Sequence, residues 1–448
     1  MRTLTNDLLQ AQLAGYPTGG YQPAIRVIFT SKDGGTTYDY SFNPTVNTNR
    51  LMYVEQREER ENDTGAIRLN NYDRSIPDDL TGYYVDVGWG HNTASGVRWA
   101  SADGAVSPRL WVVKQSLISG GRKGGAPILY SDFVLQGVWA AVLNQQEVRL
   151  GTAPYYQDES GLLAGKTVYQ CLEYLIETTL TAQSGYTFTL DAIGDQDDSV
   201  ISATIPFPIV QDQDVVQDLA YRVLTLGTTS NWSAMGASSD TPSVGELFIS
   251  TGVAGDGTGT VVGTPLINLN GTPDDGTGTY GSPTTPGKFE TYGQLIKDLL
   301  NQTNCVLRAE AGLAFKVVWP QDTDATNETY YSSVALGHPF YEYLSNRLAM
   351  VPNHIQVFSK DTAEASVSGD WYDPDHYSSP PTYDGPFMPV VRSKYQDGLT
   401  TSALCDDQAA IEGRQLKIDQ LSQRLIIPMD ARVELFDRVS ILDTRAVS

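Results

Sequence analysis

Histidine is scarce in this chain, and its spacing offers no catalytic or metal-binding motif. None of the histidines belongs to an HExxH pattern or lies near a second histidine in the sequence. The sequence also lacks a GxSxG nucleophile elbow, so acyl-enzyme chemistry has no obvious nucleophile. We therefore expect a protein that is not an enzyme, with no catalytic, cofactor-binding or metal-binding residue. We interpret each histidine as a surface or turn residue: His91, His338, His354 and His376.

Cysteine and long apolar runs are equally rare. Cys171, Cys305 and Cys405 are far apart in the sequence and form no CxxC or Cys/His pattern, which predicts reduced, buried, small apolar side chains. The N-terminus lacks the apolar run of a signal peptide, and no stretch approaches eighteen apolar residues. The sequence therefore predicts no membrane span and a protein that is made and kept reduced inside a cell.

Positive charge is in deficit. The chain has 30 Lys and Arg against 53 Asp and Glu, a net charge of −23. Tight binding of DNA or RNA needs Lys and Arg to contact phosphates, so we expect no such binding. An acidic surface can still guide a polyanion through a channel, because repulsion prevents sticking.

Turn-forming and strand-forming residues are abundant by contrast. The 41 Gly, 23 Pro and 25 Tyr, with only 19% charged residues, favour β structure joined by many turns. A chain of 448 residues should hold two to four domains. The fold class that we predict is α+β and predominantly β.

Strand patterns concentrate in two regions. Residues 20–150 read as one antiparallel barrel or sandwich, with alternating segments at 65–71 and 80–88 and a long strand at 128–142. A second β region opens at 351–358, and the chain closes on strands that include 432–443. The mixed-charge run from Glu55 to Asp63 is predicted to be a solvated strand or hairpin tip, with a partner surface as the alternative. Exposed edge strands at 50–57 and 432–442 are the segments that we expect to pair with a neighbour.

Two helix-then-strand units between these regions read alike. Thr167, Gln170, Leu175 and Thr179 recur 124 residues later as Thr291, Gln294, Leu299 and Thr303. Apolar residues in both units have the spacing of one helical face, which predicts two similar helices. Internal duplication of a scaffold is the interpretation that we favour, with chance similarity as the alternative. Further helices are predicted over 1–15, 215–224 and 402–421.

These segments predict the following domain order. Residues 1–150 form an N-terminal helix and a first β-barrel, and residues 151–232 form a helix–sheet module. Residues 233–288, rich in Gly, Thr and Asp, are predicted to be a surface excursion with too few large apolar residues to build a core. Residues 289–345 form a second helix–sheet module, and residues 346–448 form a second β-barrel.

One loop carries the acids best suited to a glycosidase pair. Asp370, Asp373 and Asp375 lie beside Trp371 and Tyr372 in a Pro-rich segment. Acids next to aromatic residues occur in sugar-binding clefts, and catalytic carboxylates of this class meet only in the fold. Such residues are more common in loops that simply pack, so packing is the prediction and a sugar site the alternative.

Short motifs along most of the chain resemble bacteriophage tail proteins. The first of them is similar to the opening of minor tail proteins, and the rest resemble the first and second barrels of tail baseplate hub proteins. The motifs are Met1–Leu4 with Leu8–Gln12, then Ile67–Asn71, Leu80–Gly82 and Val85–Gly90, and finally Pro352–Val357, Ser402–Leu421, Ile427–Pro428 and Leu435–Ile441. The stretch at 233–288 matches no motif of that family.

The resemblance implies a structural virion protein at the tip of a phage tail, assembled in the host cytoplasm. Hub proteins have two tail-tube-like barrels per chain and form a homotrimer, so that six barrels continue the tail tube as a pseudo-hexameric ring. The implied partners are further copies of the chain, the tail tube or distal tail protein, fibre or spike proteins and the tape measure protein, while DNA passes through the lumen without specific binding. A distal-tail ring, a receptor-binding adhesin and a carbohydrate-active enzyme are the alternatives.

Overall fold

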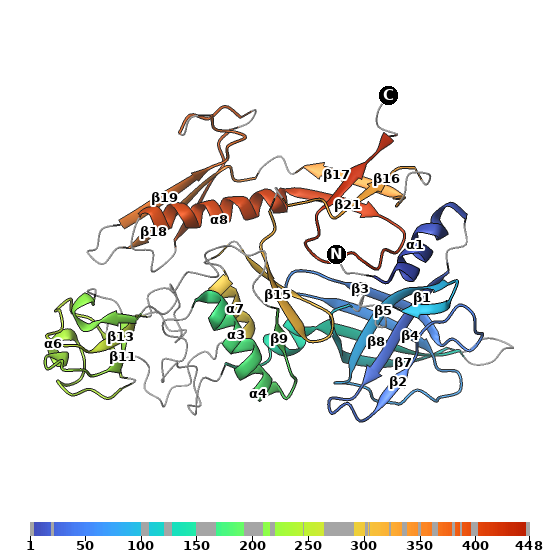
Figure 1. Cartoon of the computed structure of the whole chain (residues 1–448), viewed down its shortest axis with the longest axis horizontal. Helices are drawn as coiled ribbons and strands as arrows, with labels where there is room; N and C mark the ends of the chain where they lie inside the picture. Colours follow the sequence, from blue (N-terminus) through green and yellow to red (C-terminus); the bar gives the residue numbers. More distant parts are fainter. Residues whose placement is uncertain are drawn as a thin grey trace.

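The computed structural model is mostly β, with a few helices, in agreement with the predicted class (Figure 1). No helix in the described part of the chain is long and apolar enough to cross a membrane. The residues that the structure describes are 4–18, 22–99, 107–120, 128–148, 167–191, 209–215, 220–244, 246–263, 291–300, 303, 305–321, 324–333, 338–347, 351–360, 366–378, 381–385, 388–395 and 402–444.

The N-terminal region forms an eight-stranded antiparallel sheet with the order β2-β1-β5-β7-β8-β4-β3, and β6 pairs with β5. Helix α1 (Asn6–Thr18) packs against β5. The strands are β1 (Pro23–Thr30), β2 (Thr37–Asp39), β3 (Leu51–Arg57), β4 (Thr64–Asn70), β5 (Tyr84–Thr93), β6 (Gly96–Trp99), β7 (Leu110–Gly120) and β8 (Ile128–Gly137).

This sheet curls around its own core. Phe29 on β1 and Phe133 on β8 have ring centroids 4.9 Å apart, although β5 and β7 lie between their strands. In a flat sheet, three strand spacings would separate them by roughly 14 Å. The alternating apolar residues of β1, β4, β5, β7 and β8 therefore meet in one buried cluster on the concave face. No described hydrogen bond joins β2 to β3, so the sheet is curled but is not a closed barrel.

The strand predicted over 128–142 extends five residues beyond the end of the observed strand. Strand β8 ends at Gly137, and a π-helical turn, η1, follows over Trp139–Leu143. A Cβ atom on Gly137 would lie 2.4 Å from the Cβ of Asp63, so the backbone of this glycine fits closely against the β3–β4 hairpin. Trp139, Val142 and Leu143 then turn into the core of the next unit.

The two similar helices lie together in that next unit (Figure 1). They are α3 (Val168–Glu173), continued by η2 (Tyr174–Leu180) and α4 (Thr181–Ser184), and α7 (Tyr292–Leu300). The shared Thr and Gln residues are helix caps: the Thr167 hydroxyl accepts from the Gln170 amide at 3.2 Å, and the Thr291 hydroxyl accepts from the Gln294 amide at 3.3 Å. The helix at each predicted position is confirmed.

Both helices bury their apolar faces in a single core. Leu172, Leu175, Leu295 and Leu299 share this cluster with Trp111 of the first sheet. A three-stranded sheet of order β14-β15-β9 covers it, in which β14 and β15 pair as an antiparallel hairpin. The strands are β9 (Thr189–Leu190), β14 (Val306–Ala309) and β15 (Ala314–Val318). The two units with similar sequences therefore contribute to one folded body.

A small sheet of order β10-β13-β11-β12 occupies residues 209–263, where two predictions are wrong. The helix expected at 215–224 is replaced by strand β11, which alternates Tyr221 and Val223 into the core. The described part of the Gly/Thr/Asp-rich stretch adds Met235, Phe248 and Val261 to that core, although composition predicted none. Its remainder, 264–288, lies outside the described residues. The elements are β10 (Ile209–Gln211), η3 (Asp212–Asp214), β11 (Ala220–Thr225), α6 (Trp232–Met235), β12 (Leu247–Ile249) and β13 (Thr260–Gly263).

The second β region is built around one long helix. The predicted helix is confirmed as α8 (Ser402–Gln420), which packs on a sheet of order β19-β18-β20. Glycine permits the close approach: a Cβ on Gly369 would lie 2.2 Å from the Asp406 nitrogen, and one on Gly413 would lie 2.2 Å from the Trp371 ring. The strands are β18 (His354–Lys360), β19 (Ser366–Tyr372) and β20 (Val391–Tyr395).

Two further strand pairs complete the described structure, and neither closes a barrel. Strand β17 (Glu342–Arg347) pairs with β21 (Leu421–Ile426), and β16 (Glu328–Tyr331) pairs with β22 (Val439–Leu442). The strand predicted at 432–443 is thus only four residues long. Its first half is irregular, with Phe436 in the left-handed region at φ 70°.

Candidate functional site

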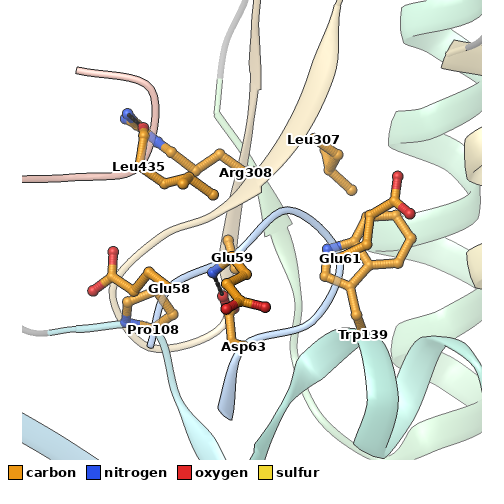
Figure 2. A pocket seen from close by; sticks show the side chains of 10 residues that line it. Glu58, Glu59, Glu61, Asp63, Pro108, Trp139, Leu307, Arg308 and Leu435 are labelled. Carbon is orange, nitrogen blue, oxygen red and sulfur yellow. Dashed lines mark hydrogen bonds between the residues drawn. The ribbon is translucent and has the colours of Figure 1, made fainter. Parts of the chain in front are cut away.

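An acidic pocket lies where the first sheet meets the helical unit and the C-terminal segment (Figure 2). Its empty space of about 230 Å³ includes a part that is open to solvent. The lining residues come from the β3–β4 hairpin, the residue pair before β7, η1, β14 and the segment before β22: Glu58, Glu59, Glu61, Asp63, Pro108, Trp139, Leu307, Arg308, Ala309 and Leu435. The mixed-charge hairpin is thus not wholly solvated, because part of it lines a junction inside the chain.

Asp63 is the buried acid of this junction. Its Oδ1 accepts from the Glu59 backbone N–H at 2.9 Å, and its side chain packs against Gly137. The pKa of Asp63 is raised to about 7, and burial is the main cause. The hydrogen bond from the Glu59 amide partly offsets burial, and the charges of Glu58 and Glu59 add to it. The carboxyl group therefore stays protonated well above its ordinary range.

Arg308 provides the positive charge on the opposite wall. It is 9% exposed, donates to Glu310 Oε1 at 2.7 Å and to the Leu435 carbonyl at 2.9 Å, and lies 3.7 Å from Glu434. Burial raises the pKa of Glu310 more than Arg308 lowers it, and the Glu434 charge raises it further. Arg308 thereby fastens the C-terminal segment to β14, which is a structural role. Across the described residues, no group of three or more His, Cys, Asp or Glu side chains is arranged to hold a metal ion.

The acids of the candidate sugar loop form ion pairs within the chain. Asp373 is 4% exposed and receives hydrogen bonds from Lys417 Nζ and His376 Nδ1, each at 2.8 Å. Burial alone would raise the pKa of Asp373, but the Lys417 hydrogen bond and the other donors bring it below its ordinary value. Asp375 contacts the same lysine at 2.7 Å, and Asp370 lies 2.7 Å from His354 Nε2. These contacts tie the loop to α8 and β18.

The aromatic residues next to these acids also pack internally. Trp371 lies against Gly413 of α8. The Tyr372 ring stacks on His354, with a centroid distance of 4.3 Å, and meets Tyr377 edge-on at 5.0 Å. This arrangement agrees with the predicted packing role, although Asp370, Trp371 and Tyr372 lie on strand β19 and not in a loop.

The prediction of surface histidines is wrong for two of the four. His91 is 1% exposed and His338 is 5% exposed. Burial lowers the pKa of His91 to about 4, and the negative charge of Asp430 partly offsets this effect. The pKa of His338 is also lowered, mainly by burial and next by the positive charge of Arg432. Neither histidine follows a sequence pattern that marks burial, because each is buried by segments distant in the chain. The three cysteines are all buried and none forms a disulfide, as predicted.

A buried cluster joins the two ends of the described chain. Asp430 accepts from Gln12 Nε2 of α1 at 2.8 Å and from the Tyr330 hydroxyl at 3.0 Å. Arg432 contacts Asp430 at 2.8 Å and Glu328 at 2.7 Å. Burial would raise the pKa of Asp430, but the hydrogen bonds and charge of Arg432 and the hydrogen bond from Gln12 together outweigh burial, and the pKa is lowered. No sequence motif predicted this cluster, since Gln12 and Asp430 are 418 residues apart.

Strands β3 and β20 are two of the sheet edges that the described residues leave exposed. Strand β3 ends the eight-stranded sheet, and β20 ends the three-stranded sheet, with no described strand on the outer side of either. The β3 residues Met52 and Tyr53 are half exposed, as are Val391 and Tyr395 of β20. The expectation of an exposed edge at 50–57 is met, and the one at 432–442 is met only over β22, which has β16 as its one described partner. The edge at β20 does not follow from the sequence.

Comparison with known proteins gives no family assignment. No family model matches the chain, and no curated protein matches it in sequence. Among solved structures, it is similar to the tail protein from Neisseria meningitidis MC58, with 11% identity, a TM-score of 0.49 and coverage of 96% of this chain and 89% of that one. It is also similar to the 43 kDa tail protein of prophage MuSo2 from Shewanella oneidensis, with 8% identity, a TM-score of 0.45 and coverage of 94% and 90%. At identities this low, the function has to follow from the residues of this chain.

Proposed function

We propose that this chain is a structural protein of a bacteriophage tail, and that it acts as a trimeric hub at the tail tip. The observation that carries the proposal is the curled first sheet, in which Phe29 and Phe133 meet across two intervening strands. Ile67–Asn71 and Val85–Gly90, two motifs that resemble the first barrel of hub proteins, lie on β4 and β5 of that sheet. Pro352–Val357 leads into β18, the central strand of the second β region.

The proposal includes two tail-tube-like barrels for each chain. In a trimer, three copies would place six such units in a pseudo-hexameric ring that continues the tail tube. The open edges β3 and β20 support this arrangement, because an edge strand with exposed apolar residues is unfavourable in an isolated monomer and is satisfied by a neighbour. We assign residues 1–150 and 346–448 to these units and the residues between them to the connecting modules.

The acidic charge supports a DNA conduit rather than a DNA-binding surface. A net charge of −23 gives a ring whose walls repel phosphate, so that DNA would pass through without being held. In this role, the faces of the ring would contact the tail tube or distal tail protein on one side, and fibre, spike or tape measure proteins on the other.

The test is the native mass of the purified protein together with negative-stain images of the same sample. The expected result is a three-fold ring of about 147 kDa, three copies of 48.9 kDa, with a central hole. A particle that stays monomeric at every concentration would contradict the ring. Such a result would redirect attention to a distal-tail or receptor-binding role, tested by titration with host surface polysaccharide.

A further inference from the structure

The edge strand β20 is basic, and the edge strand β3 offers it one exposed acid. Strand β20 contains Arg392 and Lys394 and no acid. Glu412 of α8 contacts both cations, at 3.2 and 2.9 Å, and so balances one of the two positive charges. On β3, the side chain of Glu55 is 38% exposed and contacts Arg57 at 2.8 Å, whereas the glutamates of the following hairpin line the internal pocket. The β20 edge therefore keeps an excess of positive charge, and Glu55 is the acid of β3 that can meet it.

The side-chain faces of the two strands also match. Tyr53 and Glu55 lie on one face of β3, since the Tyr53 hydroxyl donates to Glu55 Oε2 at 2.5 Å. Arg392 and Lys394 lie on one face of β20, since both reach Glu412. Arg392 is 48% exposed and Lys394 is 37% exposed, so both remain accessible to a partner.

We propose that β3 of one copy pairs antiparallel with β20 of a second copy, with Glu55 opposite Arg392. This register places Tyr53 opposite Lys394, where the ammonium group can lie over the ring. It also places Val54 opposite Ser393 on the other face. Two other pairings are disfavoured by repulsion between cations. An antiparallel pairing shifted by two residues, with Glu55 opposite Lys394, would place Arg57 opposite Arg392. A parallel pairing with Glu55 opposite Arg392 would place Arg57 opposite Lys394.

The contact is head-to-tail, because it joins two different surfaces of the same chain. Such contacts close into rings when the rotation between copies allows it. This inference rests on the proposed trimeric hub and adds to it the surface that would join neighbouring copies. The apolar residues Met52 and Tyr395 at the exposed ends of the two edges would then be covered.

Disulfide trapping in the full chain tests the pairing. Val54→Cys and Ser393→Cys are made as separate single variants, mixed and oxidised mildly. The native cysteines are buried, so they should not compete. We expect a disulfide-linked dimer in the mixture and none in either variant alone. A mixture of Ser393→Cys with Leu344→Cys, a 46% exposed residue of β17, controls for random collision and should stay unlinked.

A charge exchange provides a second readout that does not depend on disulfide geometry. Glu55→Arg should raise the protein concentration needed for assembly by about tenfold, because like charges then face each other across the strands. Adding Arg392→Glu to the same chain should restore assembly to the wild-type range. Equal thermal melting of the single and double variants would confirm that folding is unchanged.

The outcomes separate this inference from the proposed function. A three-fold ring without the mixed disulfide, and without rescue by the charge exchange, overturns the β3–β20 pairing and leaves the hub intact. A disulfide dimer in Val54→Cys alone shows that β3 pairs with itself, which also overturns it. Failure to form a ring at any concentration overturns the trimeric hub and, with it, the pairing.

Discussion

At the scale of single residues, Asp63 shows how the junction couples charge to stability. Burial raises its pKa in the folded protein to about 7, from an ordinary value of 3.8. Between about pH 4 and pH 7, the folded chain therefore binds a proton that the unfolded chain has released. The contribution of Asp63 to the free energy of unfolding decreases as the pH rises through this range and is lowest above pH 7.

Asp63→Asn should remove this pH dependence. The amide is neutral at every pH and its oxygen can still accept from the Glu59 amide, so the variant should match the wild type near pH 4. At pH 8 it should be more stable by up to about 4 kcal/mol, because the pKa of Asp63 in the folded chain is higher than in the unfolded chain by roughly three. Thermal melting between pH 4 and pH 8 measures the difference, and Asp78→Asn, at an exposed position, is the control. A variant that is less stable than the wild type at pH 8 would contradict the protonated state of Asp63.

Asp373 should behave in the opposite way, because its pKa is lowered. Asp373→Asn removes the buried charge that pairs with Lys417 and one of the two oxygens that accept from Lys417 and His376, so it should destabilise the fold by about 2 kcal/mol at pH 7. Asp375→Asn, at a side chain that is 72% exposed, should change stability by less than about 0.5 kcal/mol. Urea unfolding of the two variants gives the comparison. Equal, small effects would remove the structural role of Asp373 and return the loop to consideration as a sugar site.

At the scale of elements, the close approach of α8 to β19 depends on two glycines. Gly413→Ala would bring a methyl group within 2.2 Å of the Trp371 ring, so the helix would have to move away. The expected cost is about 1–3 kcal/mol. Gly120→Ala is the matched control, since its nearest neighbour would lie at 3.9 Å, an ordinary contact. Thermal melting measures the cost, and the difference between the near-ultraviolet circular dichroism spectra of variant and wild type would report a displaced Trp371 ring. Unchanged melting and an unchanged spectrum would show that the contact is not tight.

The elements that the sequence predicted are those determined by local signals. The helices that start at Thr167 and Thr291 are predictable because their caps and apolar spacing lie within a few residues of each other. Helix α8 is predictable because its pattern extends over 19 residues. The prediction of a helix at β11 was wrong because a short run of Val, Tyr and Leu fits both the helical and the strand spacing of apolar residues. Pairing with β12 and β13 makes this segment a strand. The burial of His91 and the contacts of Arg308 depend on segments distant in the chain, which one sequence does not reveal.

At the scale of the whole molecule, the segment between β21 and β22 connects the helical unit to α1 and the first sheet. Arg308 holds the Leu435 carbonyl to the helical unit, and Asp430 holds Gln12 of α1 beside the first sheet. Leu4 just before α1, Trp89 of β5 and Ala431 pack together at the same place. These contacts connect the N-terminal helix directly to the segment that precedes β22.

Gln12→Ala tests this connection. The change removes the hydrogen bond to Asp430 and the one that the Ala431 amide donates to Gln12 Oε1 at 3.2 Å, at a buried position. A loss of about 1–3 kcal/mol of local stability should speed amide hydrogen exchange by about 5- to 150-fold, measured by mass spectrometry. Because the bonds are shared, peptides from both α1 and residues 429–433 should respond, whereas the exposed control Gln10→Ala should change neither. Faster exchange in α1 alone would contradict the connection. It would mean that the contact of Arg432 with Glu328 of β16 holds residues 429–433 in place without help from α1.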